Sequence, residues 1–166
     1  MRKLFWVVTF SLTAVFAEGL DADLFKNLKF RFIGPDGNRA IAVAGVSSDH
    51  NTYYVGAASG GLFRTKNNGI SWQPIFDDQD VSSVSALAVS QKNPNIVWAG
   101  TGETFVIRPA HAIGDGIYKS NDGGDSWTNM GLGKTARIGR IVIHPENDNI
   151  VYAAALGHTY GPQKER

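Results

Sequence analysis

The sequence of 166 residues contains no cysteine, so no disulfide can stabilise its fold. It also lacks a strong charge of either sign, because 16 lysines and arginines face 15 aspartates and glutamates. This balance provides no electrostatic attraction to nucleic acid or to an anionic membrane surface. Beyond the N-terminus no stretch shows a sustained helical period. These absences leave a chain whose fold must depend on the burial of its core.

The N-terminus has the features of an export signal. Arg2 and Lys3 precede an apolar run over residues 4–16, and Val15 and Ala17 place small residues before a predicted cut. A run this short with a basic front is typical of a secretory signal rather than a membrane span, although a retained anchor or a buried helix is the alternative. Residues 1–17 are therefore predicted to be removed, which leaves 149 residues, a net charge of −1 and no membrane span. The mature protein is expected in the periplasm, the cell envelope or the medium.

Two segments rich in turn-forming residues end in tryptophan. "TKNNGISW" begins at Thr65, and "SNDGGDSW" follows 55 residues later, beginning at Ser120. Side chains of Asp, Asn, Ser and Thr bond to the backbone of tight turns, and glycine permits positive φ. The pattern resembles the Asp-box, S-x-D-x-G-x-x-W, of bacterial neuraminidase repeats. In the second copy all four positions match, namely Ser120, Asp122, Gly124 and Trp127. In the first copy Gly69 and Trp72 match, and Thr65 and Asn67 stand in for Ser and Asp. These eight are here called the box residues.

Short alternating strands recur around these turns. Stretches that begin at Val43, Ala86 and Arg140 each read as a strand, a polar turn and a second strand. In the first two stretches a third strand, the box residues and a fourth strand follow. Nineteen glycines and the many Val, Ile, Tyr and Trp residues indicate an all-β chain. A four-stranded unit that repeats every 43 to 55 residues predicts one antiparallel β-propeller blade per repeat, and a β-sandwich is the weaker alternative.

The repeats divide the chain into about two and a half blades. The blades are predicted at about 38–76 and 83–130, with an incomplete third at 137–166. Residues 18–37 form a linker and a strand, at 28–35, that resembles the outer strand of a closing blade. Two and a half blades cannot close a ring. We therefore expect an N-terminal part of a larger protein, with the remaining blades as its partner.

From "LFKNLKFRFIGP" to "HPENDNIVYAAALG", the mature chain resembles the sortilin-like Asp-box propeller proteins that bacteria export. The resemblance implies a large propeller, often followed by further domains. It implies no defined biochemical role.

Signals of catalysis are weak. Neither Arg31 nor Arg108 matches the arginine motif of sialidases. Xyloglucanases with this type of propeller carry a catalytic aspartate just before a Gly-Gly pair. The matching residue here is Ala58, which has no carboxylate, and a glycosidase needs a pair of carboxylates. No calcium loop, zinc motif or phosphate loop is present, so neither a metal nor a cofactor is predicted.

The loop between the second and third strands is much longer in the second blade. It spans six residues in the first blade and eighteen, 99–116, in the second. Since functional groups concentrate on loops over a rigid scaffold, we take its polar side chains as the candidate ligand-binding residues. They are Glu103, Arg108, His111 and Asp115.

The first hypothesis is an exported module that binds a peptide, protein or glycan on this loop-rich face. The alternatives are a glycosidase-like hydrolase whose carboxylates lie partly outside the chain, and a structural part of a cell-envelope assembly.

Overall fold

The structure is a computed structural model that describes residues 21, 23, 26, 34–35, 39–105 and 112–159. The chain divides into two compact units, Met1–Phe32 and Ile33–Arg166. In the first unit, the backbone N–H of Asp23 donates to the carboxylate of Asp21 (2.9 Å). The second unit holds every strand described below. No helix among the described residues is long and apolar enough to cross a membrane.

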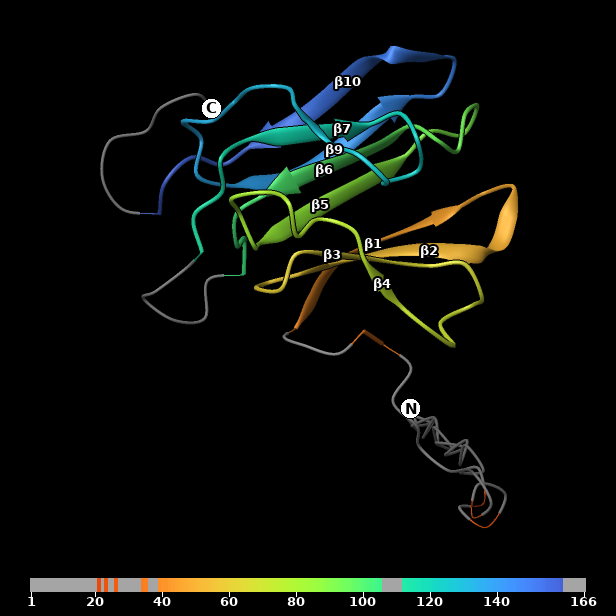
Figure 1. Cartoon of the computed structure of the whole chain (residues 1–166). Helices are drawn as coiled ribbons and strands as arrows, with labels where there is room; N and C mark the ends of the chain where they lie inside the picture. Colours follow the sequence, from red (N-terminus) through yellow and green to blue (C-terminus); the bar gives the residue numbers. More distant parts are fainter. Residues whose placement is uncertain are drawn as a thin grey trace, which may run out of the picture. The chain divides into compact units, whose positions relative to one another are not determined.

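The described residues form ten strands in three antiparallel sheets (Figure 1). The first sheet is a meander of β1 (Ala40–Val46), β2 (Asp49–Ala57), β3 (Leu62–Thr65) and β4 (Gln73–Pro74). The second repeats this order with β5 (Val84–Val89), β6 (Val97–Thr101), β7 (Ile117–Ser120) and β8 (Thr128–Asn129). The third contains β9 (Ile138–His144) and β10 (Asn147–Ala155). We call these sheets blades 1, 2 and 3.

The blades lie side by side through their first strands. β1 contacts β5, and β5 contacts β9, so the first strand of each blade is the inner one. A hollow of about 220 Å³ lies along these three strands and is lined by Ala42, Leu87 and Arg140 among others. The fourth strands, β4 and β8, are two residues long and exposed, as expected for outer edges that must not pair with other chains.

The three blades share one hydrogen bond at the entry to each inner strand. The carbonyl oxygen of the residue before the strand accepts the N–H of the residue after the second strand. The pairs are Arg39 with Ala58 (2.9 Å), Ser83 with Gly102 (3.0 Å) and Arg137 with Leu156 (2.9 Å). The repeat read from the sequence is therefore a repeat of hydrogen bonds, and equivalent residues can be compared between blades.

The core lies between the blades. One cluster joins blades 1 and 2 and includes Tyr54, Leu62, Phe76, Val84 and Tyr118. A second cluster joins blades 2 and 3 and contains Ala86, Trp98, Ile117, Ile138 and Ile141. Burial of such apolar area contributes about 25 cal/mol per Å², so each blade depends on its neighbour for most of its stability.

The predicted all-β fold with antiparallel four-stranded sheets is confirmed. The closing strand predicted at 28–35 falls almost wholly outside the described residues, and Gly34 and Pro35 are not in a strand. The export signal predicted at 1–17 also lies outside them.

Gly56 and Gly100 occupy equivalent positions in β2 and β6, opposite the first residue of the next inner strand. A Cβ atom on Gly56 would meet the backbone carbonyl of Val84. On Gly100 it would lie 2.5 Å from Cγ2 and 2.7 Å from Cβ of Ile138. Glycine is therefore required at this position for adjacent blades to approach.

We predict that Gly100→Ala lowers the free energy of unfolding by about 1–3 kcal/mol, because the added methyl group overpacks the contact between blades 2 and 3. Gly45→Ala is the control, since its methyl group would meet only the half-exposed ring of Tyr53, at 3.2 Å. Urea unfolding measures both variants. Equal stability of the two would contradict the proposed packing of the blades.

Candidate functional site

Polar side chains gather at the two opposite ends of the blades. One end, the turn face, carries the box turns, residues 65–72 and 120–127. The other end, the loop face, carries the residues between the second and third strands of blades 1 and 2. An antiparallel meander places successive connections at alternate ends, which separates the two faces.

The second box turn is held by its own side chains. The Ser120 hydroxyl accepts the N–H groups of Asp122 (3.2 Å) and Gly124 (2.7 Å) and donates to the Asp122 carboxylate (2.7 Å). That carboxylate also accepts the backbone N–H of Ser126 (2.9 Å) and its hydroxyl (2.5 Å). The hydroxyl groups of Ser126 and Ser120, in that order, hold the pKa of Asp122 well below its ordinary value. The carboxylate is thus committed to the turn.

The first box turn repeats these bonds with an amide in place of the carboxylate. The Thr65 hydroxyl accepts the N–H of Gly69 (2.9 Å), and Asn67 Oδ1 accepts the N–H of Ser71 (2.9 Å). The Asn67 amide N–H donates to the Ser71 hydroxyl (2.8 Å). An uncharged residue can therefore hold the turn at neutral pH.

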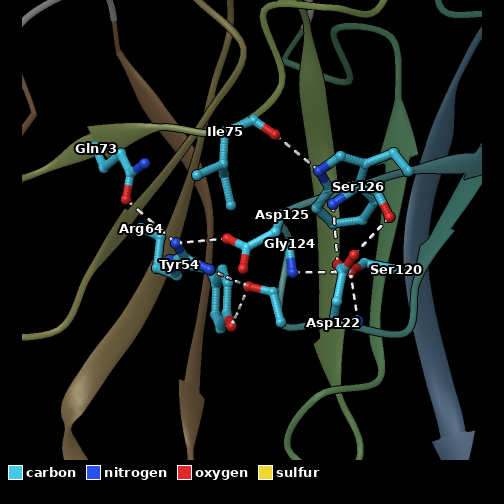
Figure 2. Close-up of polar contacts among 11 residues, drawn as sticks. Tyr54, Arg64, Gln73, Ile75, Ser120, Asp122, Gly124, Asp125 and Ser126 are labelled. Atoms are coloured by element: carbon cyan, nitrogen blue, oxygen red, sulfur yellow. Dashed lines mark hydrogen bonds and ion pairs between the residues drawn. The ribbon is translucent and has the colours of Figure 1, made fainter.

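Two buried residues of blade 1 bind the second box turn (Figure 2). The Gly123 carbonyl oxygen accepts a guanidinium N–H of Arg64 (2.7 Å) and the Tyr54 hydroxyl (2.9 Å). Arg64 is only 5% exposed and also forms an ion pair with Asp125 (2.8 Å). Burial raises the pKa of the Tyr54 hydroxyl, which stays protonated as a donor. The turn of one blade is thus docked onto the preceding blade.

The box tryptophan also points to the preceding blade. The Trp127 indole N–H donates to the Ile75 carbonyl oxygen (2.7 Å). Its ring meets Phe76 edge to face, with centroids 5.3 Å apart. The ring therefore packs between two blades. Gly124 permits this contact, because its φ is +97° and a Cβ atom there would lie 2.6 Å from Cδ1 of Ile75.

On the loop face, Asp115 is held in a network of hydroxyl groups. Its carboxylate accepts the Tyr118 hydroxyl (2.5 Å) and lies 3.2 Å from the Thr101 hydroxyl. The Thr101 oxygen in turn accepts the N–H of Asp115 (3.0 Å). Burial, followed by the bond to Asp115, raises the pKa of Tyr118. The half-exposed carboxylate is fixed in place and can accept further donors from solvent.

Glu103 does not lie open on the loop face. Its side chain is 1% exposed and forms an ion pair with Arg39, the residue that precedes β1. Its backbone N–H donates to Ala112 (2.8 Å) and joins the two ends of the long loop. Glu103 therefore connects blade 2 to blade 1, a role that its position in a polar loop did not indicate.

The other candidate residues are placed only in part. Arg108 and His111 lie outside the described residues. Phe105 and Ile113, on the two described ends of the same loop, are 61% and 63% exposed. Ala58 is 1% exposed at the end of β2, so no carboxylate stands at the position where a xyloglucanase would need one.

The sequence analysis did not identify Arg64, Tyr54 or Arg39. Arg64 follows Leu62 and Phe63 in a short strand, where a buried charge needs a partner, and this was the one signal that could have indicated it. Its partner is 59 residues away in the sequence and could not be paired without the structure.

No family model and no curated protein matches the sequence. Solved structures of GH74 enzymes resemble the fold. An ancestral GH74 enzyme superposes with a TM-score of 0.57 over 74% of the chain at 23% identity. The GH74 enzyme of Niastella koreensis superposes with a TM-score of 0.51 over 63% at 18% identity. The chain covers 16% of the length of each.

The fold is that of a β-propeller. At these identities the likeness establishes the architecture alone, and the activity of the neighbours does not transfer with it. Within the described residues it consists of two four-stranded sheets and one two-stranded sheet.

We predict that Glu103→Ala lowers the free energy of unfolding by about 2–4 kcal/mol, because it leaves the Arg39 guanidinium without its buried carboxylate. Glu146→Ala is the matched control. It breaks an exposed ion pair with Lys92 (3.6 Å), which contributes at most about 1 kcal/mol. Chemical unfolding of both variants tests this, and a loss no larger for Glu103→Ala than for Glu146→Ala would contradict a structural role.

The low pKa of Asp122 predicts a pH-dependent contribution to stability. The folded-state pKa lies below the ordinary value of 3.8, so the contribution is present above 3.8 and is lost as the pH falls towards the folded-state value. Asp122→Asn removes the titration and keeps the turn, as Asn67 does in the first box turn. We expect the stability advantage of the wild type over this variant to stay constant between pH 7 and about pH 5 and to shrink as the pH falls below 3.8. A difference that stays constant or grows below pH 3.8 would show that the carboxylate is not held as described.

Proposed function

We propose that this protein is an exported β-propeller module of the Asp-box, sortilin-like type that binds carbohydrate on its loop face. The observation that carries the proposal is the surface of the long β6–β7 loop. There the fixed carboxylate of Asp115 lies on the same loop as the exposed side chains of Phe105 and Ile113. Binding sites for small molecules combine exposed apolar or aromatic area with a few oriented polar groups.

The chemistry of the loop suits a neutral sugar. A carboxylate whose lone pairs are only partly used accepts hydroxyl groups, and an aromatic face packs against the apolar face of a sugar ring. Asp115 is positioned by Tyr118, whose own ring is fixed edge to face against Phe76 (5.1 Å). The polar group is therefore preorganised by the contact between blades 1 and 2, which lowers the entropic cost of binding.

A glycosidase is the second candidate, and the GH74 enzymes among the structural neighbours favour it. Hydrolysis of a glycosidic bond ordinarily needs two carboxyl groups that flank it. Within the described residues of the loop face, the Glu103 carboxylate forms an ion pair with Arg39, and Ala58 has no carboxyl group. These two observations support binding over hydrolysis for this part of the propeller.

We predict that Phe105→Ala and Asp115→Asn each weaken binding to a glycan array by about tenfold, the effect of losing about 1.4 kcal/mol. Arg108→Ala is expected to weaken it to a similar degree, because a guanidinium fork can hold a pair of sugar hydroxyl groups. Ser126→Ala on the turn face is the control and should bind as the wild type does.

The same protein is incubated with the bound glycans to detect release of reducing ends. Binding without hydrolysis supports the module, and hydrolysis that Asp115→Asn abolishes would support the glycosidase instead. Unchanged binding by all three loop variants would move the site away from this loop.

A further inference from the structure

The surface that binds the second box turn in blade 1 has an equivalent in blade 2. The pairing of β2 with β3 and of β6 with β7 makes Tyr54 equivalent to Trp98 and Arg64 equivalent to Lys119. Ile75, which follows β4, is equivalent to Met130, because each donates its backbone N–H to the first residue of the third strand. In blade 1 the side chains at these three positions contact the second box turn.

Trp98 presents a buried donor at the position of the Tyr54 hydroxyl. The side chain is 7% exposed, and among the described residues no acceptor meets its indole N–H. A buried donor without an acceptor costs about 1–3 kcal/mol, so an N–H group in this state indicates that an acceptor is supplied from elsewhere. In blade 1 the acceptor at this position is the carbonyl oxygen of the fourth residue of the box turn.

The neighbouring groups of blade 2 match the other contacts of a box turn. Lys119 carries a positive charge where Arg64 binds Asp125, and its ammonium group lies 5.6 Å from the centroid of the Trp98 ring. Met130 is 49% exposed, whereas its equivalent Ile75 is packed against Gly124. The cationic and apolar parts of the surface thus have the same order as in blade 1.

Blade 3 supplies the rest of the surface. All five residues of β6 are buried, whereas none of the nine residues of β10 is buried, although the two strands are equivalent. The fourth residue of each box turn donates its N–H to an asparagine carbonyl, Asn68 to Asn51 (2.9 Å) and Gly123 to Asn95 (2.8 Å). The equivalent residue in β10 is Asn149. A strand added to β10 would therefore bring a box turn within reach of Asn149.

We propose that β10, together with Trp98, Lys119 and Met130, binds a β-hairpin that carries a third box turn and forms the outer half of blade 3. The hairpin adds a strand to the edge of β10 that pairs with no described strand. The carbonyl oxygen of its fourth turn residue accepts the Trp98 indole N–H, and an acidic sixth residue pairs with Lys119.

The test uses a synthetic peptide of residues 115–131, the protein's own box hairpin, added to the purified protein. We expect the indole N–H resonance of Trp98, assigned by its loss in Trp98→Phe, to shift downfield and to exchange more slowly with solvent. The dissociation constant is measured by fluorescence anisotropy of the labelled peptide. Trp98→Phe and Lys119→Gln should each raise it about fivefold or more, while Lys66→Gln, within the first box turn, should leave it unchanged.

A control peptide replaces Gly123 and Gly124 by valine, which cannot adopt the positive φ of the turn. Weak or absent binding of this peptide is expected, and circular dichroism verifies that the protein variants remain folded. The proposal is overturned if the wild-type peptide does not shift the Trp98 resonance, if the valine peptide binds equally well, or if both blade-2 variants bind as the wild type does. Self-association that the peptide does not reduce would assign the surface to a second copy of the protein instead.

Discussion

The docking of the second box turn onto blade 1 is the interaction on which the rest of the structure depends. The Gly123 carbonyl oxygen receives two donors from blade 1, and Trp127 returns a donor to the backbone of that blade. The charged bond from Arg64 contributes about 1.5–3 kcal/mol, and the neutral bonds from Tyr54 and Trp127 contribute about 0.5–1.5 kcal/mol each. The edge-to-face contacts of Phe76 with Trp127 and Tyr118 fill the space between them. Two sheets that could not be stable alone are thereby joined into one packed unit.

This joint also orders the loop face. Tyr118 belongs to the core between blades 1 and 2, and its hydroxyl group holds Asp115 at the opposite end of the blade. Glu103 makes a second connection between the same blades through Arg39. Two contacts between blades 1 and 2, made by Tyr118 and by Glu103, therefore hold the loop that we propose for carbohydrate binding. The proposed binding loop and the second box turn therefore depend on the same interface between blades 1 and 2.

The fold could be predicted from the sequence because the repeat consists of short-range sequence patterns. The strand periods, the glycines and the turn-forming side chains of residues 65–72 and 120–127 act within a few residues of themselves. The partners of those turns could not be predicted, because Arg64 and Gly123 are brought together only by the packing of two blades. For the same reason Glu103 was predicted to be a ligand-binding side chain, whereas in the structure it is buried and forms an ion pair with Arg39. Polar residue types in a loop indicate chemistry, but burial decides whether that chemistry serves a ligand or the fold.

The most direct test of this account is native-state hydrogen exchange of the amides in β3 and β7, in the wild type and in Arg64→Met. The substitution keeps an apolar stem in β3 and removes the guanidinium that binds the turn of blade 2. If the turn joins the blades into one cooperative unit, both strands lose protection by the same free energy, on the order of 2–4 kcal/mol. Loss of protection confined to β3, with β7 unchanged, would show that the blades open independently and would contradict the account.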